Sequence, residues 1–136
     1  MKGLGRRYNA ATSATTAAVR VRLHDANTAT IFLIGATSGA ATIQEANAAS
    51  GGTAQDLAIF TEYFRQNSGV WTRVTQAAAA TVTAGTGGLL AVEMDATQLS
   101  DGFKWITASH SAGSFVIITA DLAVQRAPAA LATAIT

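Results

Sequence analysis

Two histidines, His24 and His110, are the side chains best suited to catalysis or metal binding in this chain of 136 residues. An imidazole titrates near neutral pH and can act as a base or as a metal ligand. Both lie in turn-forming stretches, "HDAN" and "ASHSAG", where an imidazole is usually only solvated. The chain has no cysteine, and its histidines lack the HExxH spacing of a zinc site. We therefore expect no metal site and no bound cofactor.

A catalytic triad could be assembled from Ser109, His110 and Asp101, because triads are recognised by geometry and not by their order in the sequence. The Gly-x-Ser-x-Gly elbow that often carries a nucleophilic serine is missing. Nothing else in the sequence supports the triad. We expect no catalytic residues and a protein that is not an enzyme.

The remaining chemical candidates are also weak. Glu93 and Asp95 are two residues apart on an expected strand and so share a face, which suits either a carboxylate pair or a solvated strand face. The chain has only eight carboxylates. An enzyme of this size would be expected to have a denser cluster of titratable groups around its active site. The sequence "GTGG" at 85–88 lacks the Lys-Ser/Thr of a phosphate-binding loop and indicates a flexible turn.

The elements that carry these residues are expected to be β-strands. In 17–23, alternation places Val19, Val21 and Leu23 on one face, with arginines on the other. The continuous apolar run in 28–37 predicts a strand covered on both faces. Residues 54–67 have both helical and strand spacing, and we favour strand. Hairpins are expected around the turns at 66–69, 85–88 and 110–113, the first bringing Tyr63, Phe64 and Trp71 near one another.

Turn signals about every ten residues predict an all-β fold, an antiparallel β-sandwich or barrel with extended N- and C-terminal arms. The length fits one domain. We expect a basic N-terminal arm over 1–16, a single β domain over 17–127 and a tail over 128–136, after the only proline. The longest apolar run is far too short to cross a bilayer, so we expect no membrane association.

The composition favours a protein that works within an assembly. Charged residues make up 12% of the chain, apolar residues 49%, and the net charge is +1, against about 25% charged residues in typical soluble proteins. A surface built from Thr, Ser, Asn, Gln and Ala is weakly hydrated, and its low net charge gives little repulsion between protein molecules. The first residues lack the apolar segment of a secretory signal, although their Arg/Ser/Thr-rich character leaves an organelle transit peptide open.

Positive charge is concentrated at the start, where five basic residues precede the first acid, Asp25. Such a segment suits an acidic protein surface, nucleic acid or simple solubilisation. Because interleaved aromatics are missing and the rest of the chain is net negative, we favour a protein partner and expect no direct contact with nucleic acid. Trp and Tyr are enriched in interface hot spots. The candidate partner-binding residues are Lys2, Arg6, Arg7, Tyr8, Arg20, Arg22, Tyr63 and Trp105.

Three stretches together resemble small virion proteins encoded among the head genes of tailed bacteriophages. They are "TIQEANAASGGTAQDLA", "GVWTRVT" and "AVEMDATQLSDGFKWITASHSAGSFVIITADLAVQRAP". The similarity covers roughly residues 29–131, and its most specific element is the Ser-Asp-Gly corner within 95–103. Apart from the resemblance, we expect the corner to have a structural role. Asp101 and Gly102 supply turn geometry, while Phe103 and Trp105 anchor the sheet.

The resemblance implies a capsid decoration or minor capsid protein on the outside of an HK97-type shell, in the virion, stabilising the capsid by bridging capsomers. Its partners would be the major capsid protein and further copies of itself, as a homotrimer. No catalytic residues come with this family. A position at the neck or tail stays open, as does a carbohydrate- or cell-surface-binding β-sandwich in which Tyr63, Trp71 or Trp105 stacks on sugars.

Overall fold

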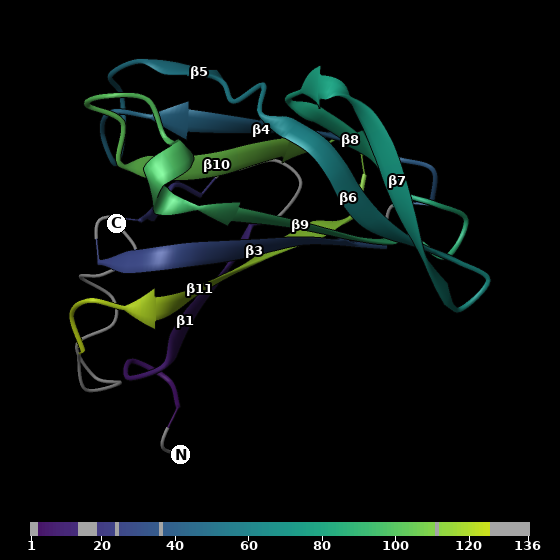
Figure 1. The fold of residues 1–136 in the computed structure, drawn as a ribbon, viewed down its shortest axis with the longest axis horizontal. Coiled ribbons are helices and arrows are strands. Elements are labelled where there is room, and N and C mark those ends of the chain that lie inside the picture. The colour runs from purple at the N-terminus through teal and green to yellow at the C-terminus, as the bar shows by residue number, and fades with distance from the viewer. Residues whose placement is uncertain (1–2, 14–18, 24, 36, 111, 126–136) are drawn as a thin grey trace.

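In a computed structural model, the described residues, 3–13, 19–23, 25–35, 37–110 and 112–125, form a β-sandwich (Figure 1). One short 3-10 helix, η1 (Ala96–Gln98), follows β9. No helix in the described part of the chain has the length and apolar character that crossing a membrane would require. The strands are β1 (Tyr8–Ser13), β2 (Val21–Arg22), β3 (Ala26–Ile34), β4 (Ala40–Ala46), β5 (Ala54–Asp56), β6 (Phe60–Asn67), β7 (Val70–Ala79), β8 (Thr81–Thr83), β9 (Leu89–Asp95), β10 (Trp105–His110) and β11 (Ser114–Leu122).

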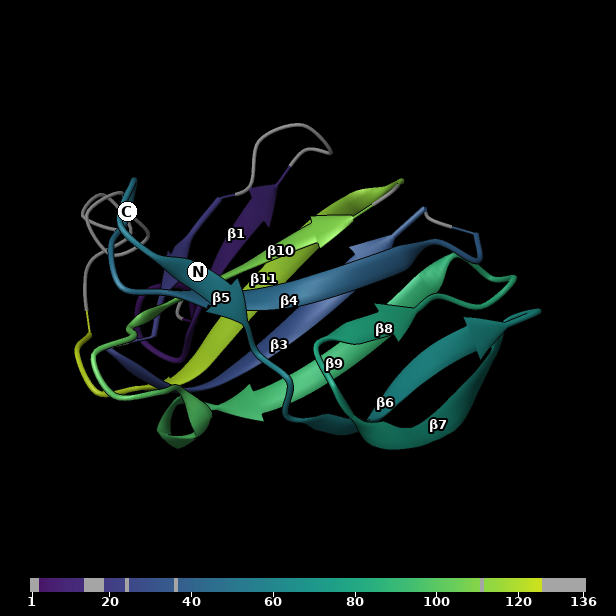
Figure 2. The ribbon, with the colours of Figure 1, turned by 90° about the horizontal axis from the view of Figure 1, so that it is seen from above.

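The strands form two antiparallel sheets. The six-stranded sheet has the order β1-β11-β3-β9-β6-β7, and the smaller sheet has the order β2-β10-β4-β5, with β8 also pairing with β4. Figure 2 shows β5, β4 and β10 lying over the larger sheet. Without β6, β7 and β8, the eight remaining strands have the order of a jelly roll, with β1-β11-β3-β9 in one sheet and β2-β10-β4-β5 in the other. The predicted all-β sandwich is confirmed.

The core lies between the sheets and follows the period-two pattern of the strands. On β3, Ile31 and Leu33 are fully buried, and Phe115 and Ile117 of β11 face the same side. Val21 and Leu23 are buried as the alternation predicts. Alternate residues of the other strands complete one continuous cluster: Ala41, Ile43, Phe60, Tyr63, Val82, Leu90, Val92, Met94, Ile106 and Ala108.

Of the three expected hairpins, only the first forms. β6 and β7 pair through a tight turn in which Ser68 and Gly69 have φ of 49° and 82°, the positive values of a hairpin turn. The other two predictions are wrong, since β8 and β10 lie in the smaller sheet while β9 and β11 lie in the larger one. The turns at 85–88 and 110–113 therefore cross between sheets.

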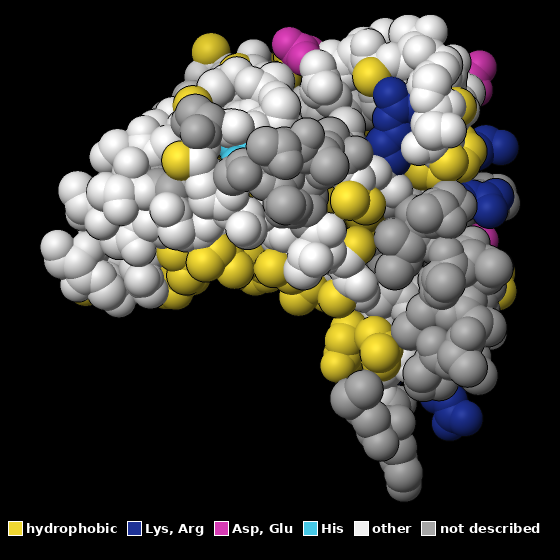
Figure 3. All heavy atoms as spheres, turned by 180° about the vertical axis from the view of Figure 1, so that it is seen from behind, with side chains coloured by type: hydrophobic (Ala, Val, Ile, Leu, Met, Phe, Trp, Pro, Cys, Tyr) yellow, Lys and Arg dark blue, Asp and Glu magenta, His cyan; other side chains and the backbone are white. Residues whose placement is uncertain are grey.

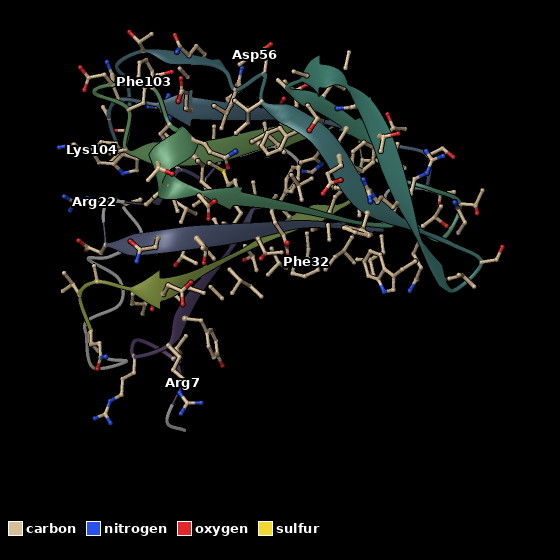
Figure 4. All side chains as sticks on the ribbon, viewed as in Figure 1. Arg7, Arg22, Phe32, Asp56, Phe103 and Lys104 are labelled. Atoms are coloured by element: carbon tan, nitrogen blue, oxygen red, sulfur yellow. The ribbon has the colours of Figure 1, made fainter. Side chains whose placement is uncertain are left out.

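The expectation that β3 is covered on both faces is also wrong. Its inward residues are buried, but Ile34 is 45% exposed and Phe32 is half-buried on the opposite side. Figure 4 shows Phe32 pointing away from the smaller sheet. The apolar run thus has one hydrophobic face that the described strands leave uncovered.

The N-terminal segment is a strand where we expected an arm. Tyr8–Ser13, within the expected 1–16 arm, form β1 and pair with β11 along their length. Before β1, the backbone N–H groups of Arg6 and Arg7 both donate to the Gly3 carbonyl oxygen, at 3.1 and 2.7 Å, and close a tight turn. Lys2 and the tail over 128–136 lie outside the described residues.

The Ser-Asp-Gly corner is tied to β4 by a buried carboxylate. Glu45 is 1% exposed and accepts hydrogen bonds from the Ser100 backbone N–H at 2.8 Å and the Gln55 side chain at 2.6 Å. Burial raises the pKa of Glu45, but the hydrogen bonds from Ser100 and Gln55 outweigh burial, so the pKa is lowered overall. Gly102 has φ of 82°, and the Phe103 N–H donates to the Ser100 carbonyl oxygen at 3.0 Å, as the turn requires.

Candidate interaction surface

The solvent-facing side of the six-stranded sheet, here called the outer face, carries most of the exposed large apolar side chains. Six such side chains are exposed in the described part of the chain. Four of them, Tyr8, Ile34, Phe64 and Trp71, lie on this face, and Val70 lies at its edge on the hairpin turn. Further apolar residues of the face are Ala10, Phe32, Leu89, Ala91, Val116, Ile118 and Ala120.

Strand register assembles these side chains into continuous rows. Val116 of β11 is opposite Phe32 of β3, Phe32 is opposite Ala91 of β9, and Ala91 is opposite Phe64 of β6. Ile118 lies opposite both Ala10 and Thr30 in the next row. Side chains opposite one another on antiparallel strands are close enough to pack. The result is an apolar band across four strands.

The outer face is hollowed. Figure 3 shows hydrophobic side chains gathered along a concave surface that runs from the β6–β7 hairpin toward the N-terminal strand. Six strands at a spacing of about 4.8 Å span roughly 24 Å, and seven residues of a strand rise roughly 23 Å. The whole face, which includes polar residues such as Thr28, Thr30 and Glu93, thus has a footprint of about 500 Å². The apolar band fills part of this area; the largest apolar patch of a typical monomer covers about 300–600 Å² and is often functional.

An aromatic cavity of about 280 Å³ lies within this face. Phe32, Phe64 and Trp71 line it, with Ala91 between the two phenylalanines and with Thr30 and Glu93 completing its wall. Phe64 and Trp71 are 41% and 45% exposed, so solvent reaches their rings. The hairpin holds both aromatics in place, so the expected proximity of Phe64 and Trp71 is confirmed. The expectation that Tyr63 joins them is wrong, because Tyr63 faces the core.

An acidic cleft of about 480 Å³ adjoins the aromatic cavity and shares Thr30 and Glu93 with it. The cleft opens where β6 separates from β9, because these strands pair only at Phe64–Ala91 and Arg65–Leu90. A β-bulge between Phe60 and Glu62 marks the same region of β6. Its carboxylates are Glu62, Glu93 and Asp95. We call the cavity and the cleft together the aromatic–acidic groove.

The carboxylates of the groove differ in their partners. Glu62 forms an ion pair of 2.9 Å with Arg73, whose side chain is 61% exposed. Glu93 and Asp95 are exposed and share a face, as the strand spacing predicts. No group of three His, Cys, Asp or Glu residues in the described ranges could hold a metal ion.

The predicted partner-binding residues within the described part of the chain lie in four separate places. Arg6, Arg7 and Tyr8 are exposed at the start of β1, next to the outer face. Arg22 stacks over the ring of Trp105 at 5.8 Å, and these two residues pair across β2 and β10 in the smaller sheet.

Arg20 and Tyr63 have structural contacts instead. The Arg20 guanidinium donates to the carbonyl oxygens of Ala48 and Gly51, which anchors the loop between β4 and β5. Tyr63 is 4% exposed, so its prediction as a contact residue is wrong. Its position on β6 points its ring into the core, and its hydroxyl accepts the Thr83 backbone N–H at 3.3 Å.

We expect Tyr63→Phe to lower the free energy of unfolding by about 1 kcal/mol, because the partly buried Thr83 N–H loses its acceptor. Self-association should be unchanged. Tyr8→Phe, at an exposed tyrosine, is the matched control and should leave stability unchanged in urea titrations. Equal stability of Tyr63→Phe and the wild type would contradict the structural role of the hydroxyl.

The structure does not assemble the catalytic candidates. His110 packs edge-on against Phe115, with ring centroids 4.5 Å apart, and its Nδ1 lies 3.1 Å from the Ala112 carbonyl oxygen. Asp101 precedes β10 and His110 ends it, so about 20 Å of strand separates them. His24 lies outside the described residues.

Backbone N–H groups of the "GTGG" turn, which could otherwise bind a phosphate, donate to groups of the β6–β7 hairpin. The Gly87 N–H donates to the Gln66 carbonyl oxygen at 2.9 Å, and the Thr86 N–H donates to Asn67 Oδ1 at 3.1 Å. A Cβ at Gly85 or Gly87 would come within 2.7 or 2.6 Å of that Gln66 oxygen. Close packing against the hairpin thus explains these glycines.

Sequence reasoning missed the main feature of the outer face, including Phe32, Ala91 and Ile118. A signal was available: the segments that form β3 and β11 both have nearly continuous apolar runs. We interpreted the first run as a strand whose two faces are both covered by other parts of the same chain. Neighbouring apolar runs are equally consistent with a face that another molecule covers.

Comparison of the chain with protein-family models, with curated proteins and with solved structures found no match.

Proposed function

We propose that this protein is a virion structural component, a capsid decoration or minor capsid protein that binds the outside of an HK97-type phage shell. The proposal rests on the resemblance of residues 29–131 to small phage head proteins and on one structural observation. That observation is the uncovered apolar outer face, with its row Val116–Phe32–Ala91–Phe64. A fold alone implies no function, so the jelly-roll order carries no weight here.

The outer face is well suited to holding subunits together. Burying apolar surface stabilises by about 25 cal/mol per Å², and a standard interface buries about 800 Å² on each partner. A protein that contacts two capsomers adds surface that must be exposed again before they separate. Repetition over a lattice raises avidity without new types of contact. Its partners would be the major capsid protein and other copies of itself.

Co-sedimentation with shells tests the proposal. We expect the purified chain to pellet with expanded shells of the phage that encodes it, and to raise the temperature at which those shells rupture. Immunogold labelling of virions should mark the head surface. Label on the neck or tail would assign the protein to that part of the virion instead of the head. The absence of both shell binding and label would contradict the proposal.

A carbohydrate-binding function is the second candidate, favoured by the aromatic cavity. Exposed Trp71 and Phe64 could stack on a sugar ring, while Glu93 and Thr30 could accept or donate hydrogen bonds to its hydroxyls. Specific binding on a glycan array that is lost in Trp71→Ala would support this function. An array without signal would remove it.

A further inference from the structure

The outer face separates its charges to opposite ends. Arg6 and Arg7 are exposed at the start of β1, which is one edge of the six-stranded sheet. Glu93 and Asp95 are exposed on β9, and Glu62 lies on the adjacent β6. The β11 and β3 part of the apolar band lies between them. We call the Arg6–Arg7 edge the basic end, although Asp121 of β11 lies near it. We call the region of Glu93 and Asp95 the acidic end, where Arg73 of β7 pairs with Glu62.

The two ends do not neutralise each other within one chain. The ion pair of Glu62 is made with Arg73 of the adjacent strand, not with the arginines of the basic end. β1 and β9 are three strand positions apart, about 14 Å, and Arg6 and Arg7 lie beyond the end of β1. Figure 4 shows Arg7 projecting away from the body of the sandwich. A contact between these charges therefore requires two molecules.

The chemistry of the groove matches a guanidinium group. Arginine stacks on aromatic faces and forms paired hydrogen bonds with carboxylates. The groove offers both: Phe64 and Trp71 are exposed in the cavity, and Glu93 lies on the wall shared by cavity and cleft. Asp95 adds a second carboxylate within the cleft.

The basic end is a shaped projection. The turn before β1 is closed by two hydrogen bonds to the Gly3 carbonyl oxygen, and Tyr8, 38% exposed, follows it. Arg6 and Arg7 are thus adjacent on a backbone that is already folded, which lowers the entropic cost of binding. A projection of this kind suits a concave partner surface, and the outer face is hollowed (Figure 3).

We propose that the Arg6–Arg7 turn of one copy docks into the aromatic–acidic groove of a second copy. The proposal deepens the proposed function, on which it rests, by naming the contact between copies. Because the two surfaces differ, the contact is heterologous, and repeating it closes a ring if the rotation allows. A ring of three copies fits the trimer implied by the resemblance. Charge complementarity on the same chain favours a second copy over another protein as the occupant.

A charge-swap series tests the contact by sedimentation velocity of the full chain. Arg6→Glu with Arg7→Glu should weaken self-association about 100-fold, and Glu93→Arg with Asp95→Arg should do the same, since each replaces attraction with repulsion. The chain that carries all four substitutions should recover association to within about threefold of the wild type. Lys104→Glu alters an exposed charge away from both ends (Figure 4) and should change nothing.

Recovery in the fourfold variant would support the contact, because a folding defect would not be repaired by a second pair of substitutions. Wild-type association in the Arg6→Glu, Arg7→Glu variant would overturn it. Normal self-association with lost shell binding in that variant would also overturn it, and would assign the arginines to the shell while leaving the proposed function intact. Recovery in the fourfold variant without shell binding by the wild type would keep this contact and refute the proposed function.

Discussion

Replacing Glu45 with glutamine is expected to lower the free energy of unfolding by about 2–3 kcal/mol at pH 7, the range for losing hydrogen bonds to a buried charged group. Glu45 is 1% exposed and accepts from both Ser100 and Gln55. A glutamine side chain has only one acceptor oxygen, so its NH₂ group would face either the Ser100 N–H or the Gln55 NH₂, both of which are donors. Urea or guanidinium titrations followed by circular dichroism would measure the loss.

The same substitution should change the pH dependence of stability. The pKa of Glu45 is lowered from its ordinary value of 4.5 in the folded chain. Its stabilisation is therefore complete above the unfolded pKa, at about pH 5 and higher, and is lost as pH falls through the folded pKa. The gap between wild type and Glu45→Gln should stay constant from pH 6 to 8 and narrow progressively below pH 4.5.

Glu93→Gln provides the matched control, because Glu93 is exposed on the outer face. Its stability should stay within about 0.5 kcal/mol of the wild type at every pH. A gap between wild type and Glu45→Gln that stays equally large at pH 3 would refute the assigned role of the Glu45 carboxylate.

The second large effect is expected from Ala91→Asp on assembly. Ala91 lies between Phe32 and Phe64 in the apolar row, so the new carboxylate would be buried without a partner when another subunit covers the face. An uncompensated buried charge costs about 3 kcal/mol or more, which corresponds to at least about 100-fold weaker association. Sedimentation velocity and shell pelleting would both report the loss.

Ala40→Asp is the matched control for this variant, since Ala40 is exposed on β4 of the smaller sheet. Both variants should keep the circular dichroism spectrum and unfold within about 1 kcal/mol of the wild type, because Ala40 is exposed and Ala91, although half-buried, faces the open aromatic cavity. Equal assembly of the two variants would exclude the outer face as the covered surface. Equal loss in both would point to general insolubility.

Local patterns were sufficient for the strands and their inward faces. The alternation of Val21 and Leu23 and the spacing within β6 identified strands because burial on one face imposes a period of two. The Ser68–Gly69 turn identified the β6–β7 hairpin because two consecutive positive φ values favour a short list of residues. These features depend on neighbours in the sequence.

The connections between sheets could not be predicted in the same way. The turns at 85–88 and 110–113 resemble hairpin turns, yet their flanking strands pair with distant segments, such as β11 with β3. In a jelly roll, packing between the two sheets determines which strands pair within each sheet. Glu45 and Ser100 are likewise 55 residues apart in the sequence, and each lies in one of the three stretches on which the resemblance rests.

Of the predicted partner-binding residues, only those of the basic end lie at the candidate surface. Arg6, Arg7 and Tyr8 are exposed beside the outer face. The acidic end depends on β9 and β6 becoming neighbours, and the apolar band depends on the register of β11, β3 and β9. Tyr63 was assigned wrongly because alternation alone does not say which of two faces is the core.

Tryptophan accessibility tests most directly whether another subunit covers the outer face. Trp71, on the face, is 45% exposed, and the chain has only two tryptophans, so Trp105→Phe leaves Trp71 as the sole reporter. In dilute isolated chain, acrylamide should quench its fluorescence strongly. On self-association and shell binding, its emission should shift to shorter wavelength and quenching should fall several-fold. Unchanged emission and quenching in fully assembled particles would contradict the account.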